Sequence, residues 1–287
     1  MSVGQIAQGA VPGVARRVAK KDATFVLALV VTGIIIVIAV VGPWIAPYPA
    51  DELYVGPVNG APSLAHLFGT DDVGRDILSR VLVGAQVSVF APIAVVVLST
   101  LLGLSLAVTA AWFGGWVSGV LARIIDVIFA IPGLVLAVLA VAMFGKGVVA
   151  PIVALSIAYI PVVARLTQTA ASRELGKPYF AALRVQGVSS GAMLFRHLLP
   201  ALIPLVAAQM AVGFGYAMLD LAAISFLGLG QQPPAPDWGS MIAAGQAGIL
   251  AGAPEQSVFP AIFVVVTVLA VGVIGARVTL RVEERER

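Results

Sequence analysis

The feature of this sequence that most restricts its fold is a run of 42 residues, 81–122, without a single charged side chain. A helix of about 20 apolar residues crosses the roughly 30 Å hydrocarbon core of a bilayer. Backbone N–H and C=O groups in that core must be hydrogen-bonded within the protein, which restricts a spanning segment to a helix or a closed barrel. The run is therefore long enough for two spanning helices, with the cluster Trp112–Trp116 at the break between them.

Further uncharged stretches raise the number of predicted spans to six. Charged residues make up only 11% of the chain, against about 25% in soluble domains, so most of its surface cannot face water. Prolines lie within or beside several spans, Pro132 among them, and predict kinked helices. The fold class is an all-α polytopic membrane protein with spans near residues 24–46, 86–111, 120–144, 148–166, 200–227 and 258–276.

The basic residues indicate which side of the membrane each loop occupies, because cytoplasmic loops retain Lys and Arg. With the N-terminus inside, 14 of the 17 basic residues fall on the cytoplasmic side. Both termini are then cytoplasmic, and the pI of about 9.4 reflects this topology and not a nucleic-acid partner. The first span lacks a small-residue cleavage site and is expected to be retained in the mature protein.

These spans divide the chain into five parts. We expect a cytoplasmic N-terminal segment (1–23), a first transmembrane helix (24–46), an extracytoplasmic loop with an interfacial helix (47–85), a five-helix core (86–276) that includes a cytoplasmic loop (167–199), and a cytoplasmic tail (277–287).

Several kinds of chemistry lack the residues they need. The chain has no cysteine, and its two histidines, His66 and His197, leave little for a metal site, so neither a catalytic nor a metal-binding residue is predicted. No Walker sequence occurs, so ATP would have to be bound by another subunit. Residues 187–191 match G-x-S-x-G, but they lie between two predicted helices, whereas a nucleophile elbow needs a strand before it.

The external loop ends in a polar segment, residues 66–80. Thr70 can cap a helix whose first turn carries Asp71 and Asp72, and Asp76 and Arg80 have i,i+4 spacing. We therefore predict a capped helix along the outer interface. A cation site built from the three aspartates is the alternative, although their spacing is not that of a calcium loop.

The cytoplasmic loop predicts two short helices joined by a glycine. Pro178 suits a first helical position, Gly187 can end that helix in the left-handed conformation, and Ser189 or Ser190 can cap a second helix that ends at Pro200. The apolar residues of this loop have no soluble core of their own to enter. They either rest on the bilayer or fill a groove in another protein, and the residues alone leave both open.

Two acids lie in or near the spans. Asp220 is inside the fifth, where an aspartate costs roughly 2.5–3.5 kcal/mol to insert, so it either faces an aqueous cavity or bonds to a neighbouring helix. Asp126 lies three residues after Arg123, which favours a structural ion pair.

Three motifs together resemble one family, the inner-membrane permease subunits of ATP-binding-cassette importers, in particular the C-type subunit of dipeptide and oligopeptide systems. The outer segment is similar to the subgroup's GTDxxGRDxLSR signature, at Gly69, Thr70, Asp71, Gly74, Arg75 and Asp76. The cytoplasmic loop resembles the EAA motif, at Ala181, Ala182, Leu183, Gly187, His197, Leu199 and Pro200, with Ser190 and Met193 in its second helix. The segment after the fifth span resembles SFLGLGxQPPxPxWG, at Ser225, Phe226, Leu227, Gly228, Gly230, Pro233, Pro234, Trp238 and Gly239.

The chain departs from the family pattern at two places. Ala181 stands where the EAA motif has its glutamate, so any salt bridge made by that glutamate is missing. Leu221 stands where relatives often have a glutamate in the fifth span, and Asp220 is about 100° away around the helix.

The resemblance implies a type I importer permease that pairs with a homologous permease, with an extracytoplasmic binding protein delivering the cargo. Two ATPases would dock on the cytoplasmic loops and hold the ATP and Mg, so that this chain binds no cofactor itself. Asp220 is a candidate to line the translocation pathway. Dipeptides or oligopeptides are the implied cargo; nickel chelates, glutathione or another peptide-like solute are alternatives, and a stand-alone secondary transporter or channel is the rival from another class.

Overall fold

The computed structural model describes residues 12–286, and the side chains of residues 23–280. The first 11 residues of the predicted N-terminal segment and the last residue of the predicted tail lie outside the described part. The helices are α1 (Pro12–Ile45), α2 (Ile77–Phe113), α3 (Gly115–Phe129), α4 (Gly133–Phe144), α5 (Val149–Leu175), α6 (Pro178–Val185), α7 (Ser190–Met193), the π-helical turn η1 (Leu194–Leu198), α8 (Leu199–Phe226), α9 (Trp238–Ala244), α10 (Gln246–Leu250) and α11 (Glu255–Glu286).

The helices confirm the all-α class and the approximate number of spans. Within the described residues, five helices are long and apolar enough to cross a membrane, and the pair α3 and α4 makes a sixth candidate. The predicted break near Trp112 is confirmed, because α2 ends at Phe113 and α3 begins two residues later, with Gly114 between them at a φ of 60°.

The third predicted span is wrong as a single helix. Its two halves, α3 and α4, are bent by 76° relative to each other. Pro132 lies at the bend in an extended conformation, with a ψ of 133°, and is the residue directly before α4. Proline lacks the N–H that a helix interior requires, which explains why the helix stops here.

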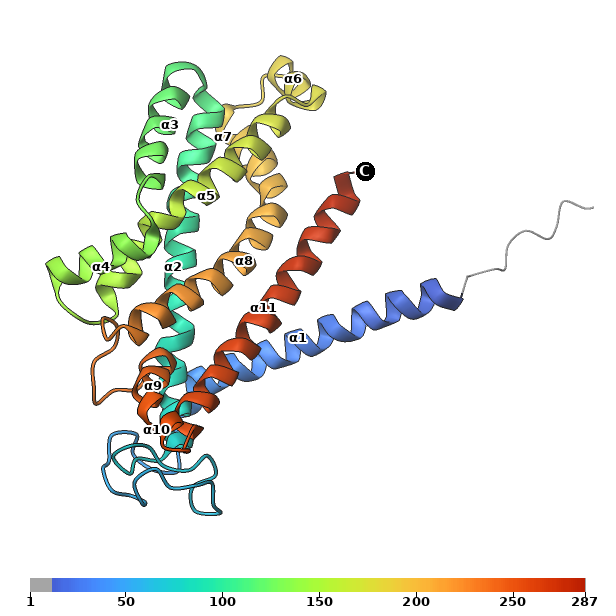
Figure 1. Ribbon diagram of the computed structural model, residues 1–287. Coiled ribbons are helices and arrows are strands. Elements are labelled where there is room, and N and C mark those ends of the chain that lie inside the picture. The colour runs from blue at the N-terminus through green and yellow to red at the C-terminus, as the bar shows by residue number, and fades with distance from the viewer. Residues whose placement is uncertain (1–11, 287) are drawn as a thin grey trace, which may run out of the picture.

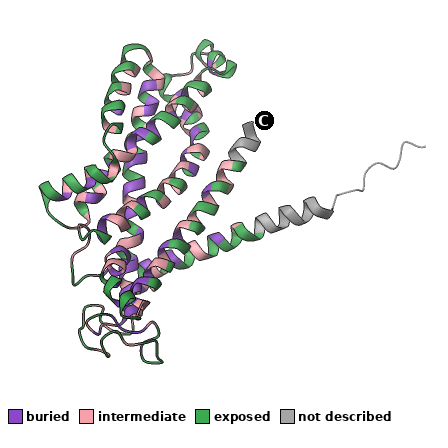
Figure 2. Cartoon of the chain, in the orientation of Figure 1, coloured by how far each residue is buried: buried purple, intermediate pink, exposed green. Residues whose placement is uncertain are grey.

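The interior of the bundle is built around α2 (Figure 1), which contacts α1, α5 and α8. Its apolar core combines Val89 and Val95 of α2 with Leu155 of α5 and Met218 of α8. Many large apolar side chains on the outward faces of the helices are exposed (Figure 2), as expected for surfaces that meet lipid or another subunit.

The two ends of the bundle differ. At one end, residues 46–76 gather with α9 and α10, and at the other end α6 and α7 lie near the turn between α2 and α3 (Figure 1). The charge distribution predicts that the first end is extracytoplasmic and that the second is cytoplasmic.

Candidate functional site

Residues 178–198 of the predicted cytoplasmic loop have a glycine turn at their centre and are called the elbow below. Pro178 is the first residue of α6. Ser189 caps α7 by accepting a hydrogen bond from the N–H of Ala192 at 3.3 Å. The predicted glycine end of the first helix and the predicted serine cap of the second are therefore present. The predicted stop at Pro200 is wrong, because α7, η1 and α8 form one uninterrupted helical segment from Ser190 to Phe226.

Gly187 has a φ of +74°. Its N–H donates to the carbonyl of Arg184, and the N–H of Val188 donates to the carbonyl of Leu183, both at 3.1 Å. These two bonds are the Schellman pattern, which ends a helix and needs a left-handed residue between them. A Cβ at Gly187 would meet nothing within 4 Å, so backbone conformation and not space is the reason for glycine.

The elbow has an apolar core, contrary to the expectation that its apolar residues must be covered by lipid or a partner. Phe180 and Leu198 are fully buried and Met193 is 5% exposed, and they cluster with Ala171 of α5 and Leu202 of α8. The sequence could not show this core, because it forms between segments that are adjacent only in the folded bundle. The elbow is thereby fixed to the ends of the spanning helices.

The outward surface of the elbow remains exposed. Val185 is 90% and Phe195 68% exposed, and Arg184 and Arg196 of the elbow and Arg173 near the end of α5 are exposed as well. Four further motif residues are exposed, namely Ala181, Ala182, Ser190 and Pro200. Three are partly buried, namely Leu183, His197 and Leu199. Exposed large apolar side chains in a loop that also carries exposed cations, outside the predicted bilayer, are typical of a protein-binding surface.

Glu174 is a residue of this region that the motif comparison missed. Its carboxylate accepts a hydrogen bond from the phenol of Tyr179 at 2.6 Å and pairs with Lys177 Nζ at 2.6 Å. Burial and the bond to Glu174 raise the pKa of the Tyr179 phenol. The i,i+3 spacing of Glu174 and Lys177 was the available signal. The pair ties the start of the elbow to the end of α5.

Asp220 lies on α8, and its Oδ2 accepts a hydrogen bond of 2.7 Å from the phenol of Tyr159 on α5. The sequence left open whether Asp220 faces an aqueous cavity or bonds to a neighbouring helix, and the structure shows a bond to a neighbouring helix. The carboxylate is nevertheless only partly buried, so one side of it remains accessible.

Asp126 pairs with Arg123 at 4.0 Å, as predicted. A second and closer partner, Arg165 of α5, could not be read from spacing, since it lies 39 residues away. The guanidinium of Arg165 also lies 5.0 Å from the ring centre of Phe129. Together these contacts attach α3 to α5 at the cytoplasmic side.

The outer motif forms a buried polar cluster, called the outer knot below and made of residues 66–80. The carboxylate of Asp71 is fully buried, with Arg75 Nε at 2.6 Å and Arg80 Nε at 3.6 Å. Asp76 accepts from the N–H and hydroxyl of Ser79, at 2.8 and 2.7 Å, and lies 2.9 Å from Nδ1 of His66. These carboxylates therefore have internal partners.

The predicted helix start at Thr70 is wrong. Asp76 is the N-cap, α2 begins at Ile77, and no separate interfacial helix precedes it within the described residues. Thr70 instead donates its hydroxyl to the carbonyl of Pro57 and accepts from the N–H of Gly60. Gly69 and Gly74 have φ values of +77° and +75°, and a Cβ at either would lie within 2.6 Å of a carbonyl oxygen. The alternative of a cation site is not supported, because no group of three or more His, Cys, Asp or Glu side chains in the described chain could hold a metal ion.

The signature after α8 is a packing motif. A Cβ on Gly230 would lie 2.0 Å from the hydroxyl of Ser225, and one on Gly239 would lie 2.5 Å from the carbonyl of Ala222. Trp238 is fully buried and donates from Nε1 to the carbonyl of Val81 at 3.0 Å. Phe226, Leu227, Pro233 and Pro234 are exposed. Ser225, Gly230, Trp238 and Gly239 therefore join α8, α9 and α2.

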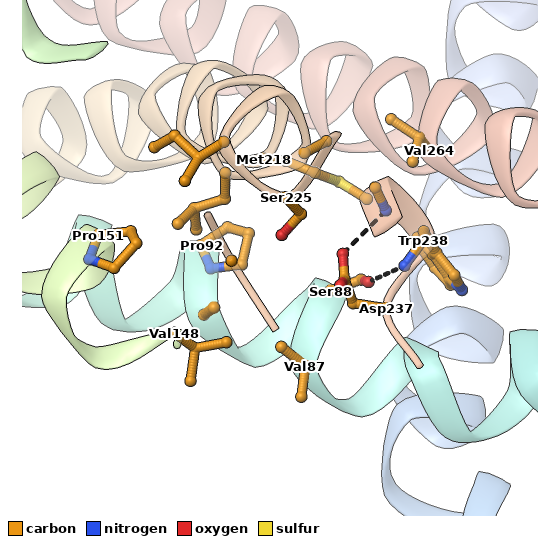
Figure 3. Close-up of a pocket in the computed structure, with 16 residues that line it drawn as sticks. Val87, Ser88, Pro92, Val148, Pro151, Met218, Ser225, Asp237, Trp238 and Val264 are labelled. Atoms are coloured by element: carbon orange, nitrogen blue, oxygen red, sulfur yellow. Dashed lines mark hydrogen bonds between the residues drawn. The ribbon is translucent and has the colours of Figure 1, made fainter. Parts of the chain in front are cut away.

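A small cavity borders this motif (Figure 3), with Ser88, Asp237 and Trp238 together on one side of it. Its volume of about 30 Å³ holds a water molecule and not a peptide. A second cavity of about 240 Å³, lined by Thr32, Phe214 and Thr267 and otherwise by aliphatic side chains and one methionine, offers little to a polar solute.

Comparisons with known proteins agree with the three motifs. Residues 99–287 match the family described as binding-protein-dependent transport system inner membrane component, and residues 13–62 match the N-terminal TM domain of oligopeptide transport permease C. The chain is 38% identical over 243 residues to the glutathione transport system permease protein GsiD of Escherichia coli O6:K15:H31 and to that of Shigella boydii serotype 4. The match covers 84% of this chain and 80% of either relative.

A solved structure shows the same fold. A chain of the MetNI methionine ABC transporter in an inward-facing conformation superposes with a TM-score of 0.55 and 18% identity, over 71% of this chain and 96% of that chain. The resemblance drawn from the motifs is thus confirmed. The chain belongs to the binding-protein-dependent transport inner membrane components, as an oligopeptide-type permease subunit with several membrane-spanning helices that is not itself an enzyme.

Proposed function

We propose that this chain is the permease subunit of an ATP-driven importer for short peptides, and that its elbow transmits the closure of partner ATPases to the translocation pathway. The observation that carries the coupling role is the helical segment from Ser190 to Phe226, 37 residues without a break. At 1.5 Å per residue it extends about 55 Å, from the elbow to the outer end of α8. A displacement of the elbow therefore moves α8 as well.

The partners follow from the proposed pathway. A homologous permease would complete it, two ATPases would hold ATP and Mg and receive the elbows, and an extracytoplasmic binding protein would deliver cargo. At the elbow, Val185 and Phe195 would enter an apolar groove of the ATPase, and the three arginines would meet acidic residues at its rim. Ala181 stands where the EAA motif has its glutamate, so that negative charge is missing from the proposed contact. The charge that this chain brings to the contact is then that of Arg173, Arg184 and Arg196.

The cargo class is supported by the permease relatives, which are named for glutathione, itself a tripeptide. We propose glutathione-sized peptides as cargo. Uptake of labelled glutathione, of a dipeptide and of a nickel chelate into vesicles with the reconstituted importer decides among them. ATP-dependent uptake of the chelate alone would contradict a peptide cargo.

Gly187 tests the coupling role. The left-handed conformation is an outlier for a β-branched residue, whereas asparagine adopts it often. Gly187→Val should strain the elbow by about 1–3 kcal/mol and reduce cargo-stimulated ATPase activity and uptake, while Gly187→Asn should remain close to the wild type. Both variants should insert in the membrane. Normal coupled uptake by Gly187→Val would show that the elbow does not transmit the ATPase motion.

A further inference from the structure

One carboxylate oxygen in the membrane-spanning part of the chain is left without a partner. Oδ2 of Asp220 accepts the phenol of Tyr159, but Oδ1 has no hydrogen bond within the described residues, and no described basic side chain forms an ion pair with this acid. A carboxylate inside a membrane is costly, and its cost is normally offset by a cation or by water. Asp220 is therefore oriented by Tyr159 and still able to bind a further donor.

The free side of Asp220 belongs to an open face of α8. Tyr216 and Ala223 lie one turn before and one turn after it on the same face, and Tyr216 is 62% exposed. Ala217 and Ile224 also lie one turn from Asp220 but on its opposite flank, and they are buried in the core of the bundle together with Met218. Asp220 thus lies at the edge between the contact of α8 with α5 and a surface of α8 that no other part of the described chain covers.

The depth of this face fits an early stage of import. Asp220 is six residues before the end of α8 at Phe226, which places it about 9 Å from the outer end of that helix. The same end carries the outer knot and α9. A solute entering from the extracytoplasmic side would pass Asp220 before it reached the elbow end of α8.

The chemistry of the three side chains is that of an ammonium site. A carboxylate oxygen forms a strong charge-assisted hydrogen bond with –NH₃⁺, and a neighbouring tyrosine ring attracts a cation to its face. We propose that Asp220, oriented by Tyr159 and flanked by Tyr216, binds the free α-ammonium group of the peptide cargo. This inference rests on the proposed peptide import. The competing occupant is a cationic side chain of the second permease subunit.

The site also connects cargo to the ATPases. Asp220 and the second part of the elbow, residues 190–198, lie on the same unbroken helical segment, so an ammonium group bound at Asp220 acts on the helix that we propose to move with the elbow. Binding there would favour one position of α8 over another, which is how a cargo stimulates a coupled ATPase.

The test uses the absence of cysteine from the chain. Ala223→Cys places its only thiol one helical turn from Asp220, in the complete reconstituted importer. A cationic methanethiosulfonate should label this thiol at least about tenfold faster than an anionic one, and Asp220→Asn should remove that preference. S-Methylglutathione, which has no free thiol to consume the reagent, or a dipeptide should protect the thiol, whereas the N-acetylated forms should not, and Asp220→Asn should abolish the difference.

Three results would overturn the site: equal protection by free and N-acetylated peptides, protection that survives Asp220→Asn, or a thiol that is unreactive in every transport state because the second permease covers it. Uptake by the unmodified importer separates the two claims. Peptide uptake with amine-independent protection overturns only the ammonium site, whereas no uptake of any peptide overturns the cargo class and the site with it.

Discussion

The outer knot and the elbow carry motifs of the same family, yet their polar and apolar residues are placed in opposite ways. In the outer knot Asp71, Asp76 and Arg80 are buried and paired with one another or with their neighbours. In the elbow Val185 and Phe195 are exposed and lie outside the apolar core. The comparison teaches that a motif match identifies a family, while burial separates residues that build the fold from residues that meet a partner.

Glycine is required for two different reasons in the motifs of this chain. Gly187 in the elbow and Gly228 after α8 both have a φ of +74° and open space around a Cβ. Gly230 and Gly239, in contrast, are needed because Ser225 and Ala222 pack against them. Substitutions of Gly187 or Gly228 should alter the backbone turn at that position. Substitutions of Gly230 or Gly239 should loosen the packing of α8 against α9.

The largest expected loss of stability comes from the outer knot. Asp71→Ala leaves Arg80 without its buried partner, which should lower the free energy of unfolding by about 3–5 kcal/mol. The thermal unfolding midpoint in detergent measures this loss. The control is Asp51→Ala, at an exposed acid of the same loop, which should change the free energy of unfolding by no more than about 0.5 kcal/mol. Equal midpoints for the two variants would mean that the knot is not a structural element.

A smaller loss is expected from the packing motif. Gly239→Ala forces a methyl group against the carbonyl of Ala222 and should cost about 1–3 kcal/mol. The matched control is Gly191→Ala in α7, where a Cβ meets nothing within 4 Å and φ is not positive, so stability should stay equal or rise by about 0.4–1 kcal/mol. A stable Gly239→Ala variant would argue that α9 can move away from α8.

The smallest effect on stability is expected at the exposed surface of the elbow. Val185→Ser combined with Phe195→Ser removes no buried apolar contact, so the free energy of unfolding should change by about 0.5 kcal/mol or less. Thermal unfolding of the purified permease pair checks this. A midpoint lowered as far as that of Asp71→Ala would show that these side chains belong to the core.

The sequence predicted what depends on neighbouring residues. The helix boundary at Gly187 and the cap at Ser189 follow from local backbone chemistry and were found. Thr70 and Asp76 are both good caps by residue type. In the fold Thr70 is instead bonded to Pro57 and Gly60, and His66, ten residues earlier, contacts Asp76, and these contacts have no signal in the local sequence. The bond between Tyr159 and Asp220 spans 61 residues, and the core around Phe180 forms among four separate segments. Neither leaves a periodic signal in the sequence.

The most direct test of the central claim, that the elbow is the surface on which the ATPases act, is the affinity of the reconstituted permease pair for its ATPase subunits. With Val185→Ser and Phe195→Ser, binding should weaken about tenfold or more and cargo-stimulated ATP hydrolysis should fall with it, because two apolar anchors are lost while the fold is intact. Unchanged affinity and unchanged stimulated hydrolysis in this double variant would contradict the account.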